Sequence, residues 1–128
     1  MNPTKIWANL AVTDLAQTTK FYSELGFVSN GASQQLTSFF FGKDRFIIHF
    51  FLKDVLAESM KGELADTQRA NEIIFTLFAE TKEQADEWAK EIEQAGGTLI
   101  SQPETFGEGY YGFVFADPDG HRFNVFTM

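Results

Sequence analysis

The chain has 128 residues, of which 44% are hydrophobic and 16% aromatic, including 15 phenylalanines. This length and this apolar content fit one domain with a packed core and argue against intrinsic disorder. The formal net charge of −8 disfavours nucleic acid and anionic membranes as partners, and the absence of cysteine excludes disulfides, thiolate metal sites and a cysteine nucleophile.

The first half of the chain is predicted to hold one strand, one helix and three further strands. Residues 5–12 (KIWANLAV) alternate between two faces, as a half-buried strand does. Asp14 is expected to cap a helix that ends at Gly26. The three antiparallel strands that follow, and the turns between them, are expected at residues 27–30, 36–42 and 45–52, with turns at 30–33 and 42–44.

The second half repeats this order after a polar stretch, residues 53–70, that we interpret as a short helix and a connector. The repeat begins with a strand at residues 71–79 and a helix from Thr81 to Gly96. Three more strands follow at residues 98–106, 110–117 and 121–128. We therefore predict an α+β fold, in which a single domain contains two βαβββ modules. The modules are expected at about residues 1–58 and 71–128, joined by the connector 59–70.

Three motifs carry a resemblance to a known family: VTDLAQTTKFYSELGF early in the chain, AGG after the second helix and DPDGHRFNVF at the end. With the βαβββ repeat, they resemble the vicinal oxygen chelate superfamily, which includes glyoxalase I, bleomycin- and fosfomycin-resistance proteins and extradiol dioxygenases. The resemblance covers nearly the whole chain. It implies a cleft-bearing mixed sheet of eight strands, in which active members hold a divalent metal as a Lewis acid.

The resemblance also places the family's metal ligands at four positions, which here are Trp7, His49, Glu72 and Asn124. An indole has no lone pair for a cation, and an amide is a poor ligand for nickel or zinc. Since a tight site normally needs three good protein ligands, we expect no metal cofactor. If a divalent metal does bind, His49 and Glu72 are its expected ligands. The alternatives are a core histidine at position 49 and a solvated carboxylate at position 72.

The remaining polar and aromatic positions divide between a ligand site and a turn. Asp117 and Asp119 in DPDG are expected to form a turn, and His121 to be structural or exposed. One of the two tyrosines of GEGYYGF is expected to point inward. The residues predicted to line a ligand site are Trp7, Asn9, Phe51, Tyr110 and Asn124.

Three functions agree with these residues. The first is a glyoxalase- or bleomycin-resistance-like protein that binds a small organic molecule in an aromatic cleft, with a degenerate metal site. The second is an enzyme, either a divergent metal-dependent lyase, isomerase or dioxygenase using His49 and Glu72, or a metal-free one with His49 as general base. The third is a structural or regulatory module whose own side chains fill the cleft. Whether the chain is catalytic is left open.

The expected setting is the cytoplasm, because neither a signal peptide nor a membrane-spanning apolar run is visible. The expected partners are a small-molecule ligand and a second copy of the chain in a homodimer. Nucleic acid and membrane are not expected as partners.

Overall fold

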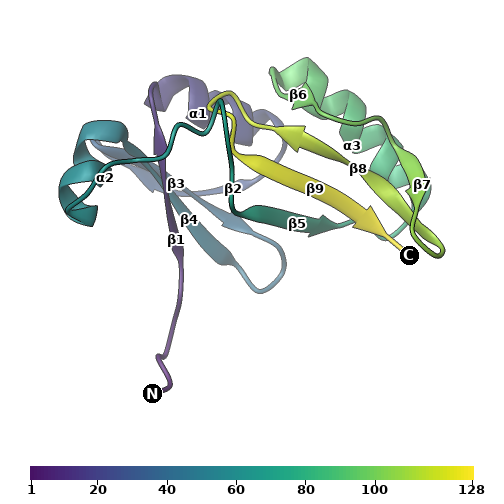
Figure 1. The fold of residues 1–128 in the computed structure, drawn as a ribbon, viewed down its shortest axis with the longest axis horizontal. Helices are drawn as coiled ribbons and strands as arrows, with labels where there is room; N and C mark the ends of the chain where they lie inside the picture. Colours follow the sequence, from purple (N-terminus) through teal and green to yellow (C-terminus); the bar gives the residue numbers. More distant parts are fainter. The chain divides into compact units, whose positions relative to one another are not determined.

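The computed structural model describes residues 1–128 and confirms the α+β class, with three helices and strands in two mixed sheets (Figure 1). The chain divides into two compact units, Met1–Leu64 and Ala65–Met128, which we call unit 1 and unit 2. None of the helices is long and apolar enough to cross a membrane.

Unit 1 follows the predicted order of strand, helix and three strands, with one helix added after them. Its elements are β1 (Ala8–Val12), α1 (Leu15–Glu24), β2 (Val28–Ala32), β3 (Leu36–Phe41), β4 (Phe46–Leu52) and α2 (Lys53–Met60). The strands lie in the order β1-β4-β3-β2, with β1 parallel to β4 and the other neighbours antiparallel. The predicted antiparallel run and the short helix after it are thus confirmed.

Unit 2 repeats the order of strand, helix and strands, with one more strand and without a helix after them. Its elements are β5 (Ile74–Phe78), α3 (Lys82–Ala95), β6 (Thr98–Leu99), β7 (Glu104–Phe106), β8 (Tyr110–Ala116) and β9 (Arg122–Thr127). The strands lie in the order β5-β9-β8-β6, and β7 also pairs with β8. As in unit 1, the first strand is parallel to the last one and the remaining pairs are antiparallel.

The helix boundaries confirm the predicted capping residues. The side chains of Asp14 and Thr81 each accept a hydrogen bond from the backbone N–H three residues later, at 3.1 and 3.0 Å. Gly26 and Gly96, with φ of 91° and 103°, end α1 and α3 in the left-handed conformation. Only glycine adopts this conformation without strain, which is why the two helices stop at these positions.

The core of unit 1 is built around Tyr22 of α1. Its ring stacks on Phe50 at 4.6 Å and lies 5.7 Å from Phe39, and it meets Phe21 edge-on at 4.9 Å. All four side chains are buried. Aromatic pairs at these distances add to the burial of apolar surface, so α1 is held on one face of the sheet.

The core of unit 2 has the same plan with smaller helix residues. Ala85, Ala89 and Ile92 of α3 are buried, and beneath them Phe115 and Phe123 stack at 5.1 Å on adjacent strands. The small alanine side chains let the helix lie close to this aromatic layer.

Two strands begin three residues later than predicted. The predicted strands start at residues 5 and 71, whereas β1 starts at Ala8 and β5 at Ile74. In unit 2 the cause is visible: Ile74 pairs with Arg122, the first residue of β9, and the preceding Gly120 belongs to a turn. The residues before Ile74 therefore have no partner strand, although the alternation of apolar and polar residues continues through them.

The predicted turn at residues 30–33 is wrong. Residues 30–32 instead form a bulge in β2, because the register with β3 shifts between Ser29 and Ala32 and Gly31 takes φ of 103°. The chain reverses later, where the N–H of Ser33 donates to the carbonyl of Leu36 at 2.9 Å.

The single strand predicted at residues 98–106 is also wrong, and the eight expected strands become nine. The N–H groups of Ile100 and Ser101 both donate to the carbonyl of Val114, at 2.8 and 3.2 Å. This bulge and the following Pro103, which lacks a donor, interrupt the ladder and leave β6 and β7 as separate short strands.

The DPDG turn is confirmed as a structural feature. One carboxylate oxygen of Asp117 accepts the N–H groups of Asp119 and His121 at 3.0 and 2.9 Å. His121 is buried. The hydroxyl of Thr67 donates to the carbonyl of Asp119 at 2.7 Å, and the amide of Asn71 donates to the carbonyl of Gly120 at 3.1 Å. The end of the predicted connector is therefore fastened to this turn.

Candidate functional site

The sheet face of unit 1 opposite α1 carries His49. The alternation along β4 buries Ile48 and Phe50 in the core and turns His49 and Phe51 to the other face, where both are partly exposed. We call the residues Trp7, Asn9, Ser38, His49 and Phe51 the His49 face. Sequence reasoning predicted all of them except Ser38.

One hydrogen bond holds the imidazole, and a second holds the serine that makes it. Nδ1 of His49 lies 2.7 Å from Oγ of Ser38, which is only 1% exposed. The same oxygen accepts a hydrogen bond from Nδ2 of Asn30 at 3.1 Å. Ser38 and His49 are directly opposite residues of β3 and β4, so the sheet register sets this contact. Sequence reasoning missed Ser38 and Asn30, because their nearness to His49 depends on that register.

Aromatic rings flank the imidazole. Trp7 meets it edge-on, with ring centroids 6.1 Å apart, and Phe51 does so at 5.9 Å. Partial burial lowers the pKa of His49 below its ordinary value of 6.5, because a charged imidazole loses hydration there. Burial therefore favours the neutral imidazole, whose ring contacts two aromatic side chains.

Trp7 and Asn9 complete the His49 face at the edge of the sheet. Trp7 lies immediately before β1 and is 49% exposed. Asn9 is the residue of β1 directly opposite His49 and is exposed. A half-exposed tryptophan beside a polar group is a common feature of ligand-binding surfaces.

Asn124 lies on the corresponding sheet face of unit 2, away from α3. Its neighbours Phe123 and Val125 are fully buried, so the predicted alternation along β9 is confirmed. The Oδ1 atom of Asn124 accepts a hydrogen bond from the hydroxyl of Thr76 at 2.7 Å, and the two residues are opposite each other on β9 and β5. The amide oxygen is thus held by its neighbour in the sheet.

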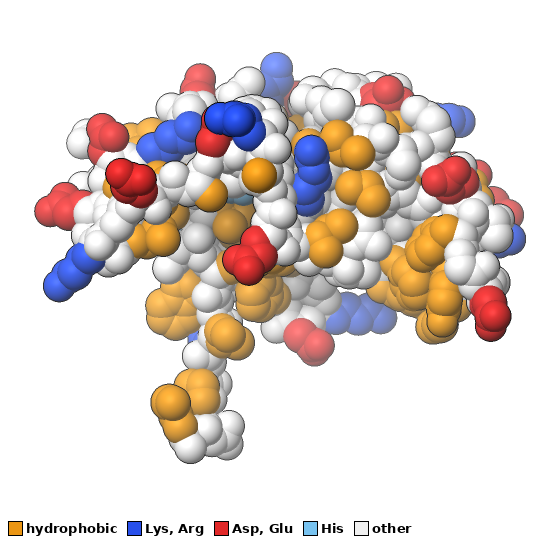
Figure 2. Space-filling model, in the orientation of Figure 1, with side chains coloured by type: hydrophobic (Ala, Val, Ile, Leu, Met, Phe, Trp, Pro, Cys, Tyr) orange, Lys and Arg blue, Asp and Glu red, His pale blue; other side chains and the backbone are white.

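An exposed aromatic cluster lies on the same face of unit 2 as Asn124. Tyr110 is 5.8 Å from Phe106 and 5.0 Å from Phe126, and Phe78 is 6.5 Å from Phe126. Phe78, Phe106 and Tyr110 are all exposed. Figure 2 shows hydrophobic side chains gathered on this side of unit 2, so Tyr110, one of the predicted ligand-site residues, belongs to an apolar surface.

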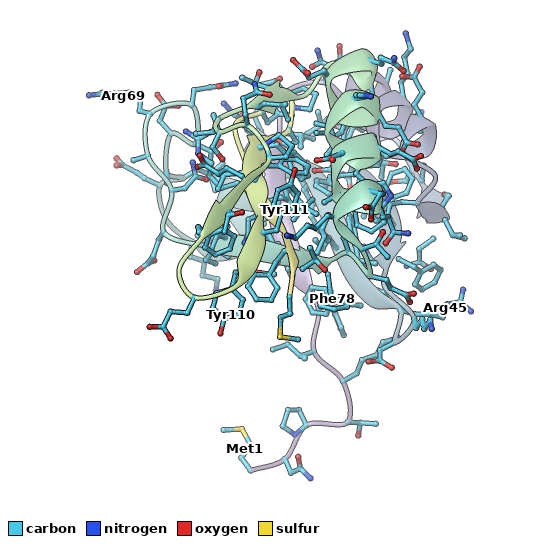
Figure 3. All side chains as sticks on the ribbon, turned by 90° about the vertical axis from the view of Figure 1, so that its right-hand side faces the viewer. Met1, Arg45, Arg69, Phe78, Tyr110 and Tyr111 are labelled. Carbon is cyan, nitrogen blue, oxygen red and sulfur yellow. The ribbon has the colours of Figure 1, made fainter.

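The two adjacent tyrosines point to different places, as alternation along β8 requires. Tyr111 lies toward α3, where its hydroxyl donates to a carboxylate oxygen of Asp86 at 2.5 Å, whereas Tyr110 packs against Phe126 on the other face (Figure 3). Tyr111 therefore joins β8 to α3.

We expect Tyr111 to ionise above its ordinary pKa of 10.0, because the hydrogen bond to Asp86 favours the neutral phenol and so raises the pKa. The contribution of this bond to stability is complete below pH 10.0 and decreases as the pH rises through the raised pKa. The ultraviolet absorbance of tyrosinate measures the titration. Asp86→Asn should lower this pKa, whereas Tyr110→Phe should not change it; an unchanged titration in Asp86→Asn would contradict the assignment.

Glu72 lies outside β5, on the exposed stretch that precedes it. The predicted strand position of this carboxylate is therefore wrong. Glu72 belongs to unit 2 and His49 to unit 1, so the pairing of the two residues stays a prediction.

The donors of each unit do not fit the family's metal site. In the His49 face, Nδ1 of His49 is bound to Ser38, so Nε2 is the one ring atom left for a metal, and Trp7 has no lone pair to offer. In unit 2 the oxygen of Asn124 is held by Thr76. No group of three or more histidine, aspartate or glutamate side chains suitable for a metal ion is found. We derive no chemistry through a metal.

Comparison with known proteins places this arrangement in a family. Residues 6–125 match the Glyoxalase/Bleomycin resistance protein/Dioxygenase superfamily. No curated protein sequence matches the chain significantly. Among solved structures, the hypothetical protein SA1046 from S. aureus is similar, with 28% identity, a TM-score of 0.88 and coverage of 100% of this chain and 96% of that one.

Two further structures share the fold at lower identity. A glyoxalase-related enzyme from Fulvimarina pelagi has 18% identity and a TM-score of 0.85, over 98% of this chain and 89% of that one. A lactoylglutathione lyase from Agrobacterium tumefaciens has 22% identity and a TM-score of 0.70, over 99% and 96%. The family match spans most of the sequence, and the chain belongs to the Glyoxalase/Bleomycin resistance protein/Dioxygenase superfamily.

Proposed function

We propose that this protein binds a small planar organic molecule, with the His49 face as its principal contact surface. The observation that carries the proposal is the partly exposed imidazole of His49, which Ser38 holds between the rings of Trp7 and Phe51. Ligand sites are typically apolar and aromatic surfaces with a few polar groups that set orientation. The His49 face combines these two properties.

The exposed aromatic cluster of unit 2 supports the same reading. Tyr110 and Asn124 are partly or largely exposed on one sheet face together with Phe78, Phe106 and Phe126. Exposed aromatic patches that lie next to polar groups often mark binding surfaces. We propose Tyr110 and Asn124 as contact residues of a binding surface on unit 2, considered by itself.

The two tryptophans of the chain provide a matched test. Trp88 lies on α3, away from the His49 face in sequence and in a different unit. In the Trp88→Phe variant, Trp7 is the only tryptophan, and we expect saturable changes of its fluorescence with small aromatic ketones, starting with acetophenone. By calorimetry, Trp7→Ala should weaken binding about tenfold or more, whereas Trp88→Phe should leave it unchanged. Equal affinity of Trp7→Ala and wild type would refute the proposed surface.

A metal-dependent enzyme using His49 and Glu72 is the competing function, because a neutral imidazole is also what a metal requires. Titration of the purified protein with nickel, zinc, manganese and iron(II) distinguishes the two. We expect no tight stoichiometric binding. Tight binding that both His49→Ala and Glu72→Ala abolish would favour the enzyme over the proposal.

A further inference from the structure

We propose that Ser38 is a positioning residue that holds His49 as the Nε2–H tautomer, so that His49 donates a hydrogen bond to an oxygen acceptor of the bound molecule. The tautomer follows from unit 1 alone. The role toward a bound molecule rests on the proposed function.

The direction of the hydrogen bond between Ser38 and His49 follows from the partners of the serine. A hydroxyl has one hydrogen to donate and two lone pairs to accept with. One lone pair accepts from Nδ2 of Asn30, since an amide nitrogen only donates. If the other lone pair accepted from His49, the hydroxyl hydrogen of a side chain that is 1% exposed would be buried without a partner, which is unfavourable. Ser38 therefore donates to Nδ1 of His49.

The consequence concerns the other nitrogen of the ring. A neutral imidazole carries one hydrogen, and if Nδ1 accepts from Ser38 that hydrogen is on Nε2. Nε2 then offers an N–H donor and has no lone pair for a proton or a metal ion. His49 in this form is a hydrogen-bond donor, in contrast to the general base or metal ligand that the sequence left open as alternatives.

The donors of the His49 face indicate the class of ligand. The indole N–H of Trp7 also donates only, and its ring centroid is 6.1 Å from that of His49. The amide of Asn9, opposite His49 on β1, adds a further donor. Donors among aromatic rings fit a planar molecule with an oxygen acceptor, such as an aromatic ketone or a nitroaromatic compound.

Long-range proton–nitrogen correlation spectra of histidine labelled with ¹⁵N report the tautomer directly. The chain has two histidines, and His49→Gln assigns their signals. We expect the Nε2–H pattern for His49 in the wild type and in Ser38→Thr, which keeps the hydroxyl. Ser38→Val has the shape of Ser38→Thr but no hydroxyl, and we expect it to lose the Nε2–H pattern. The Nδ1–H pattern in the wild type, or an unchanged pattern in Ser38→Val, would overturn the proposal.

Asn30 allows the tautomer to be reversed from an exposed position. In Asn30→Asp a carboxylate, which only accepts, replaces the donating amide. Ser38 should then donate to Asp and accept from His49, which moves the imidazole hydrogen to Nδ1. Asn9→Asp, which places the same charge opposite His49 on β1, is the control and should keep Nε2–H. Retention of the Nε2–H pattern in Asn30→Asp would refute the proposed hydrogen-bond chain from Asn30 through Ser38 to His49.

Two probes separate this inference from the proposed function. Acetophenone has a carbonyl acceptor, and ethylbenzene has a similar shape without one. Asn30→Asp should weaken acetophenone binding about tenfold and leave ethylbenzene unaffected; unchanged acetophenone affinity would overturn the donor role. If neither probe binds while Asn30→Asp still reverses the tautomer, the tautomer assignment is supported and the proposed binding surface is refuted.

Discussion

Replacing Phe50 by alanine is expected to lower the free energy of unfolding by about 3–5 kcal/mol. Phe50 is 0% exposed, and its ring stacks on Tyr22 at 4.6 Å and meets Phe39 at 6.4 Å. Truncation removes this burial and leaves a cavity that α1 and the sheet cannot close without moving. Urea denaturation measures the loss as a lower midpoint with an unchanged slope.

The neighbouring residue in β4 provides the matched control. Phe51 is on the opposite face and only partly buried, so Phe51→Ala should cost much less, about 1 kcal/mol. The same variant should weaken binding of acetophenone, because Phe51 contacts the ring of His49 at 5.9 Å. Equal losses of stability in the two alanine variants would show that the assignment of the two faces of β4 is wrong.

The second large effect is expected at Gly112 in β8, where no side chain fits. A Cβ atom added there would lie 1.9 Å from the carbonyl oxygen of Val125 and 3.3 Å from Cα of Phe126. Since these are backbone atoms of the adjacent strand, β8 and β9 would have to separate. We expect Gly112→Ala to lower the free energy of unfolding by about 2–3 kcal/mol.

Gly62, after α2, is the control for the conformational effect of adding a methyl group. An added Cβ there meets nothing within 4 Å, and its φ is not positive. Gly62→Ala should therefore change stability by no more than about 0.5 kcal/mol. Thermal and urea denaturation measure the stability of both variants. If Gly112→Ala lowered it as little as Gly62→Ala does, the close approach of β8 and β9 would be contradicted.

The sequence alone was sufficient for features that depend on neighbouring residues. Asp14 and Thr81 cap helices, and Gly26 ends one, because each acts on backbone groups within a few positions. The alternation along β4 and β9 places His49 and Asn124 opposite the core, because side chains of a strand point to alternate faces. These local rules also carried the βαβββ order and the family resemblance.

The strand boundaries required the tertiary structure, because pairing needs a partner. Glu72 and Trp7 have the alternating pattern of a strand but lie outside β5 and β1. Alternation reflects residue type, whereas a strand ends where its neighbour ends. The break between β6 and β7 follows from the bulge at Ile100 and Ser101 opposite Val114, which no residue pattern announces.

The hydrogen bonds within the candidate site were likewise decided by the register of the strands. Ser38 contacts His49 because β3 and β4 pair at these two residues, and Asn30 reaches Ser38 through the bulge in β2. Thr76 holds Asn124 in the same way across β5 and β9. The sequence by itself determined which residue types stand on each sheet face. The tertiary structure decided which of them touch, because hydrogen bonds between strands depend on a register set by the packing of the whole sheet.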